Sequence, residues 1–186
     1  MPMFFTFLEQ GFFHILDLNG LDHILFLMVL ILNYSFENWK KIVWAITAFT
    51  IAHSITLILS VYDVIILDAR VIEIGIALTI FYTAIENLFF PNMEKYRAVL
   101  AGIFGLIHGM GFSRLLKELF AGQEYNPFNT LLAFNIGIEL AQLLFVILFL
   151  LIFQSIKNLT KSSLEFVKKI ISIAIALQAL YWVFTR

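Results

Sequence analysis

The sequence predicts an all-α membrane protein, a polytopic bundle of about six transmembrane helices that follows an interfacial or re-entrant N-terminal helix. Hydrophobic residues make up 61% of the 186 residues and charged residues 13%, whereas a soluble domain has roughly 45–50% apolar and about 25% charged residues. The apolar residues also gather in stretches close to the ~20 residues that one spanning helix needs. Residues 1–186 are therefore expected to form a single integral membrane domain in contact with the lipid bilayer.

Five long apolar segments and one short segment are expected to span the membrane. The long segments cover residues 41–61, 69–90, 96–120, 128–153 and 166–184. The short segment, 21–32, follows another apolar segment, 3–18, and the pair Asn19 and Gly20 between them favours a turn. Residues 3–18 are expected to lie at the interface or to re-enter the membrane. One bent span across both segments is the alternative.

The lysine and arginine residues between these segments predict the orientation, because cytoplasmic loops of membrane proteins are enriched in them. If the N-terminus is outside, eight fall on the cytoplasmic side: Lys40, Lys41, Lys95, Arg97, Lys157, Lys161, Lys168 and Lys169. Four fall on the outer side: Arg70, Arg114, Lys117 and Arg186. This difference predicts that both termini lie outside.

The composition excludes several kinds of site. The chain has no cysteine, which excludes disulfides, thiolate metal sites and cysteine nucleophiles. The net charge is −1 and no basic stripe is present, so no nucleic-acid partner is expected. The sequence does not identify a protein partner.

The polar residues inside the apolar segments are the candidate functional residues. A charged side chain at the centre of a bilayer costs about 2.5–3.5 kcal/mol on insertion, so such groups are expected to face the bundle interior. A rise of ~1.5 Å per residue places His53, His108 and Glu139 at similar depths in the outer half of the membrane. Asp22 and His23 begin the short span at its outer end, and a break at Asn19-Gly20 would fold the N-terminal segment back onto them.

Histidines and carboxylates in this layer predict a metal site without sulfur. The candidate ligands are His14, Asp22, His23, His53, His108 and Glu139. The polar residues expected to support them are Ser54, Glu73, Glu86, Asn87, Asn135 and Gln142, of which Glu86 falls toward the inner side. Imidazole and carboxylate ligands suit nickel, cobalt, zinc or ferrous iron, and protons compete with metal for histidine. The alternative is that these side chains bind one another and fix helix packing.

Two spacings predict helix contacts around this layer. Gly105 and Gly109 form a GxxxG step that lets a neighbouring helix approach closely. Asn135, Glu139 and Gln142 share one helix face by their spacing of four and three residues. A polar stripe within an apolar span is expected to face the interior of the bundle.

Six motifs in the first five predicted spans contain these polar residues. The first is GxxHxxxxxGxDHxxF, from Gly11 to Phe26. It is followed in order by FTIAHSITL, VIEIGIALTI, AIEN, FGLIHGMGF and FNIGIELAQ. This order, over roughly residues 11–142, resembles the HupE/UreJ membrane proteins. The resemblance implies a multi-pass protein of the bacterial inner membrane and a secondary transporter of nickel or cobalt.

An enzyme is the alternative hypothesis. A catalytic metal needs about three protein ligands and an open position, and His23, His53 and His108 could supply the ligands of a zinc-type intramembrane hydrolase or transferase. Asp22 or Glu139 could then act as the general base. A structural subunit is a third possibility, if the polar residues bind nothing.

Overall fold

The structure is helical throughout the described residues. The computed structural model describes residues 3–18, 20–90, 96–112, 117, 127–159 and 164–186. This part of the chain forms seven α-helices and one 3-10 helix, without a strand. The elements are α1 (Met3–Leu16), α2 (Asp22–Ile31), η1 (Phe36–Asn38), α3 (Trp39–Val61), α4 (Ala69–Phe89), α5 (Arg97–Gly111), α7 (Pro127–Leu159) and α8 (Leu164–Thr185). The predicted all-α class is confirmed.

Among the residues that the structure describes, four stretches are long and apolar enough to cross a membrane. They cover Phe36–Val61, Ala69–Phe89, Asn129–Ile156 and Leu164–Thr185. Helices α2 and α5 are also apolar, but each is shorter than the ~20 residues of a full span. The predicted continuation of the α5 segment to residue 120 lies largely outside the described residues. Six spans therefore remain a prediction.

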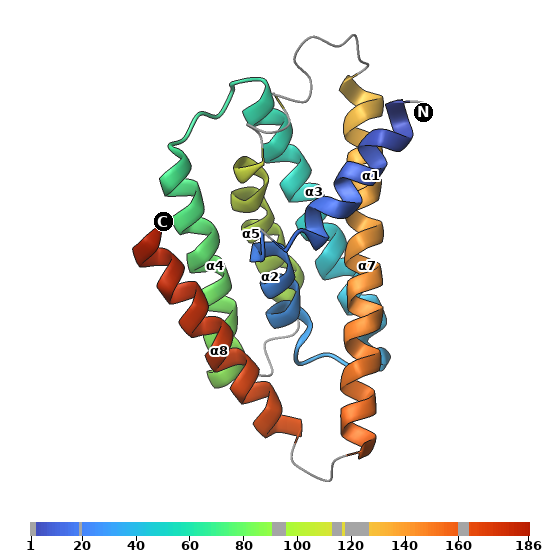
Figure 1. Ribbon diagram of the computed structural model, residues 1–186, viewed down its shortest axis with the longest axis vertical. Coiled ribbons are helices and arrows are strands. Elements are labelled where there is room, and N and C mark those ends of the chain that lie inside the picture. The colour runs from blue at the N-terminus through green and yellow to red at the C-terminus, as the bar shows by residue number, and fades with distance from the viewer. Residues whose placement is uncertain (1–2, 19, 91–95, 113–116, 118–126, 160–163) are drawn as a thin grey trace.

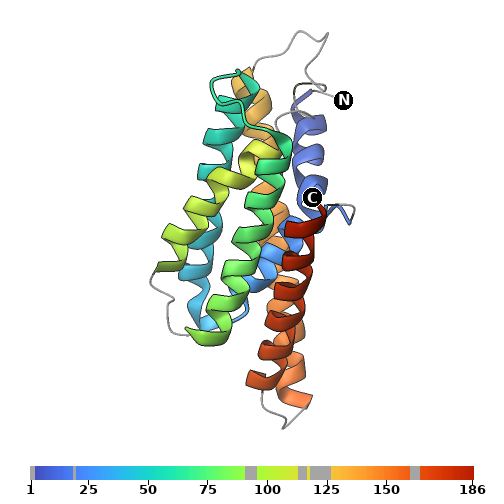
Figure 2. The same cartoon turned by 90° about the vertical axis from the view of Figure 1, so that its left-hand side faces the viewer.

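Helices α1 and α2 follow one another along the long axis of the bundle (Figure 1). Helix α1 runs from the end marked N toward the middle, α2 continues toward the opposite end, and Figure 2 shows the same order. The helices have 14 and 10 residues, so together they cover about 36 Å, compared with about 30 Å for the hydrocarbon core of a bilayer. The outer face of α1 is apolar, with Phe5 and Phe13 56% and 58% exposed. This arrangement favours one bent span over an interfacial helix.

Glycines let two pairs of helices approach closely, α3 with α5 and α1 with α7. A Cβ atom on Gly109 would collide with the carbonyl oxygen of His53, and one on Gly105 would collide with that of Phe49. On the other side of the bundle, a Cβ on Gly11 would collide with the carbonyl oxygen of Phe134. The predicted GxxxG contact is therefore present, and only glycine fits at these crossings. The crossing at Gly109 also fixes the backbone beside His108 against α3.

A buried arginine holds the end of α2. Arg97 is 1% exposed, and its Nη1 donates to the carbonyl oxygens of Val29 and Leu30 at 3.2 and 2.8 Å. Its Nη2 donates to Asn87 Oδ1 at 2.5 Å and lies 3.6 Å from Glu86 Oε1. The last turn of a helix leaves carbonyl groups without a partner in the helix, and Arg97 supplies donors to two of them. Glu86 and Asn87, which were expected to support the metal site, lie in this network at the far end of α2.

Candidate metal site

Three histidines from three helices form the centre of the site. His14 lies in the last turn of α1, His23 in the first turn of α2 and His53 in α3. Each offers a ring nitrogen, and the three nitrogens lie within 4.8 Å of one another. The ring centroids of His14 and His23 are 4.5 Å apart, and both lie about 6 Å from that of His53, at 6.1 and 6.0 Å.

The turn between α1 and α2 brings His14 and His23 together, as the sequence predicted. The backbone N–H of Gly20 donates to the carbonyl oxygen of Asp17 at 3.1 Å, which links the two sides of the break between the helices. A Cβ on Gly20 would meet only that same oxygen, at 4.0 Å. The turn therefore depends on its backbone hydrogen bond and not on the absence of a side chain at position 20.

His108, on α5, lies at the edge of this group. Its ring centroid is 5.5 Å from that of His23, and the residue is 1% exposed. It is not one of the three residues whose nitrogens lie within 4.8 Å. The structure thus brings all four histidines together. The enzyme hypothesis named His23, His53 and His108 as the three ligands, whereas the closest group contains His14 instead of His108.

Several histidine nitrogens are buried without a hydrogen-bond partner among the described residues. They are Nε2 of His14, Nε2 of His23, both ring nitrogens of His53 and Nδ1 of His108. Leaving one buried polar atom unpaired costs about 1–3 kcal/mol. A purely structural histidine would be expected to make at least one such bond, and His53 makes none among the described residues. Neutral imidazole nitrogens with free lone pairs are suitable ligands for a transition-metal ion.

A cavity of about 410 Å³ reaches three of these histidines, His14, His23 and His108. Three carboxylates, those of Asp17, Asp22 and Glu73, and the guanidinium of Arg186 also line it. A cleft with an excess of one sign of charge raises the local concentration of the opposite ion. The cavity can therefore attract divalent cations toward the histidines, while His53, which is 0% exposed, lies beneath it.

Asp22 is paired with an arginine that sequence reasoning did not assign to the site. The guanidinium of Arg186 donates to both carboxylate oxygens of Asp22, at 2.9 and 3.1 Å. Arg186 also lies over the ring of Trp182, with 4.4 Å between the guanidinium carbon and the ring centroid. The pair is 164 positions apart in the chain, so no local pattern could have indicated it. Asp22 as a metal ligand stays a prediction, and it requires Arg186 to move.

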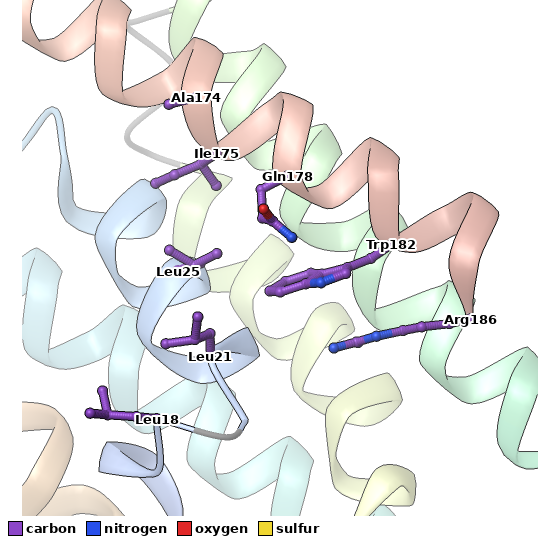
Figure 3. Close-up of a pocket in the computed structure, with 8 residues that line it drawn as sticks. All are labelled: Leu18, Leu21, Leu25, Ala174, Ile175, Gln178, Trp182 and Arg186. Atoms are coloured by element: carbon purple, nitrogen blue, oxygen red, sulfur yellow. The ribbon is translucent and has the colours of Figure 1, made fainter.

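A second cavity of about 480 Å³ lies beside the first, between α2 and α8. Figure 3 shows Trp182 and Arg186 extending from α8 toward the start of α2, with leucines on the facing side. Arg186 lines both cavities. No histidine or carboxylate lines this second cavity among the described residues, so the candidate chemistry belongs to the first.

The polar stripe of α7 contacts α3. Its three side chains each accept a hydrogen bond from a hydroxyl group of α3. The pairs are Thr47 to Glu139 at 2.7 Å, Thr50 to Gln142 at 2.8 Å and Ser54 to Asn135 at 2.5 Å. Thr47 precedes His53 by a rise of about 9 Å along α3, and Glu139 is not in the group of three close ligands. Its role as a metal ligand stays a prediction, and these contacts favour helix packing.

An aromatic layer lies on the opposite side of the histidines from the cavity. Phe26 lies on α2 between His23 and the end that Arg97 contacts, and Phe104 lies on α5 between His108 and Arg97. Phe49 precedes His53 by one turn of α3. The ring of Phe26 is 5.0 Å from Phe49 and 5.9 Å from Phe104. Phe26 and Phe49 are 0% and 1% exposed. These aromatic rings therefore cover the histidines on this side.

Comparison with known proteins gives one family. The family model described as HupE / UreJ protein matches residues 1–186, the whole chain. Comparisons with curated proteins and with solved structures found no match.

Proposed function

The chain belongs to the HupE/UreJ family, and on this basis we propose that it is a secondary transporter of a divalent transition metal, nickel or cobalt. The family is associated with nickel and cobalt transport. The observation that carries the proposal is the group of His14, His23 and the fully buried His53, with nitrogens within 4.8 Å of one another. In this account the protein lies in the bacterial inner membrane with both termini outside, as the distribution of lysine and arginine predicts.

The three histidines are the proposed binding site of the transported ion. Nitrogens bound to one ion at about 2.1 Å lie roughly 3–3.5 Å apart, so a small contraction would close the group around the ion. His108 and a carboxylate from the cavity are proposed as further ligands. A site without thiolate binds these ions less tightly than one with it, which suits release.

The closure of the histidines by aromatic rings on one side supports a transport cycle. The cavity leads to the histidines from one side, and the aromatic layer with the Arg97 network closes the other. Alternating access needs a second conformation in which the cavity side is closed and the side of the aromatic layer is open. With the termini outside, the open cavity faces outward, which is the state that receives the ion in an uptake cycle.

A metal-dependent hydrolase is the second candidate function. Three histidines beside a cavity match the three ligands and open position of a catalytic zinc site. Against this candidate, Asp22, which the hypothesis offered as a general base, is paired with Arg186. A catalytic ion would resist chelators, whereas a transported ion exchanges readily.

Uptake of nickel and cobalt into proteoliposomes tests the proposal. We expect the wild type to accumulate at least one of these ions and His53→Ala to lose most of the uptake. Gln178→Ala is the control, because Gln178 lines only the second cavity among those described, and its uptake should equal that of the wild type. Absence of uptake by the wild type, or full uptake by His53→Ala, would contradict the proposal.

A further inference from the structure

A threonine on α4 contacts the histidine at the edge of the site. Thr79 and His108 are 5% and 1% exposed. The Thr79 Oγ1 atom donates to the carbonyl oxygen of Ile76 at 2.7 Å and lies 3.1 Å from Nε2 of His108. The hydroxyl therefore has two polar partners in a buried place.

The single hydroxyl proton decides which nitrogen of His108 carries hydrogen. A carbonyl oxygen can only accept, so the 2.7 Å contact with Ile76 takes the Thr79 proton. The remaining contact needs an N–H on His108 Nε2 that donates to the threonine oxygen. If the Thr79 hydroxyl instead donated to His108 Nε2, lone pairs of Thr79 Oγ1 and of the Ile76 carbonyl oxygen would face each other at 2.7 Å without a proton between them.

A neutral histidine with its proton on Nε2 keeps a free lone pair on Nδ1. The Nδ1 atom of His108 is buried and has no hydrogen-bond partner in the described part of the chain. His108 lines the cavity that also reaches His14 and His23, and its ring centroid is 5.5 Å from that of His23. The free lone pair thus belongs to a ring at the cluster of candidate ligands.

We propose that Thr79 is a positioning residue that fixes the tautomer of His108, so that Nδ1 binds the transition-metal ion. The inference rests on the proposed function and adds a fourth nitrogen to the group of His14, His23 and His53. Metal-bound histidines commonly donate their other N–H to an oxygen, which fixes the ring orientation and raises the basicity of the ligating nitrogen. Thr79 supplies that oxygen.

Three variants separate this role from a general effect on packing. Thr79→Val removes the hydroxyl and keeps the shape, and Thr79→Ser restores the hydroxyl. Thr83→Val is the matched control, because Thr83 lies one turn further along α4, is 2% exposed, and donates only to the Thr79 carbonyl oxygen, at 2.8 Å. Thermal unfolding in detergent then shows how much stability each buried hydroxyl contributes.

Two measurements test the proposal. Nitrogen-15 NMR of histidine-labelled, metal-free protein reads the tautomer of His108, which we expect to be the Nε2–H form in the wild type and in Thr79→Ser, and a mixture in Thr79→Val. Titration with Ni²⁺ or Co²⁺ should show about a 10-fold loss of affinity in Thr79→Val, and values within about 2-fold of wild type for Thr79→Ser and Thr83→Val.

The outcomes distinguish this inference from the proposed function. An Nδ1–H tautomer in the wild type, or wild-type affinity in Thr79→Val, overturns the inference while leaving a metal-binding protein. Equal losses in Thr79→Val and Thr83→Val also overturn it, because they would indicate packing alone. A wild type that binds neither ion overturns the proposed function and, with it, this role of Thr79.

Discussion

Replacing Arg97 with methionine should destabilise the protein strongly, because the arginine is the buried link between α2, α4 and α5. The substitution keeps much of the side-chain volume and removes every donor. It leaves the carbonyl groups of Val29 and Leu30 without their hydrogen bonds of 3.2 and 2.8 Å from Arg97. It also leaves Glu86, which is 3% exposed, without the guanidinium 3.6 Å away.

The magnitude follows from these contacts. Removing one partner of a buried ion pair costs about 3–5 kcal/mol, because the other charge stays buried without compensation. We therefore expect Arg97→Met to lower the free energy of unfolding by about 3–5 kcal/mol. Combining it with Glu86→Gln removes the stranded charge, so the double variant should be more stable than the sum of the single losses predicts, by about 1–3 kcal/mol.

Reversible unfolding of the purified protein in mixed micelles measures these values. Arg70→Met is the control, because Arg70 is exposed at the start of α4 and surface changes are usually within about 0.5 kcal/mol. Because Arg97 holds the end of α2 that lies opposite His23, metal affinity should also fall in Arg97→Met. Equal stability of Arg97→Met and Arg70→Met, or strict additivity with Glu86→Gln, would refute the network as the anchor of α2.

Three further predictions address the site and its supports. Gly109→Ala should cost about 1–3 kcal/mol of stability through overpacking, measured by the same unfolding assay, since its Cβ would collide with the His53 backbone; wild-type stability would argue against the close crossing. Arg186→Gln should raise Ni²⁺ affinity several-fold at low ionic strength and by less at high salt, because the substitution removes the positive charge beside Asp22. An unchanged affinity would place Arg186 outside the site. Bound metal should stay constant at neutral pH and decrease as the pH falls from about 5 to 3, because protonated histidine cannot ligate; metal analysis after equilibration at each pH measures it, and full occupancy at the lowest pH would argue against histidine ligands.

The sequence predicted the gathering of the four histidines because polar groups in lipid must face the bundle interior. His14 and His23 meet because the chain turns between two apolar segments, and the GxxxG step at Gly105 and Gly109 indicated where α5 approaches α3. These features depend on local patterns along one helix or one turn. They could therefore be predicted without knowing which helices are neighbours.

The pairing of individual polar side chains could not be predicted in the same way. Arg97 was counted as a loop cation, but it is buried beside Glu86, and the match depends on how α4, α5 and α2 meet. The depth assigned to Glu139 was counted from residue 128, whereas α7 has 33 residues and is longer than one span needs. The number of residues from the start of α7 therefore does not give the depth of Glu139 in the membrane. Glu139 contacts Thr47, which precedes His53 by about 9 Å along α3.

His14, His23 and His53 are proposed to hold one divalent transition-metal ion together. X-ray absorption spectroscopy of protein loaded with one equivalent of Ni²⁺ or Co²⁺, combined with metal analysis of the three single histidine-to-alanine variants, tests this site. We expect imidazole ligands with nitrogen–metal distances of about 2.0–2.2 Å, no sulfur, and loss of most of the metal in each variant, with full occupancy in Gln178→Ala. A wild type that stays metal-free when metal is in excess, or stoichiometric metal retained in any of the three variants, would contradict it.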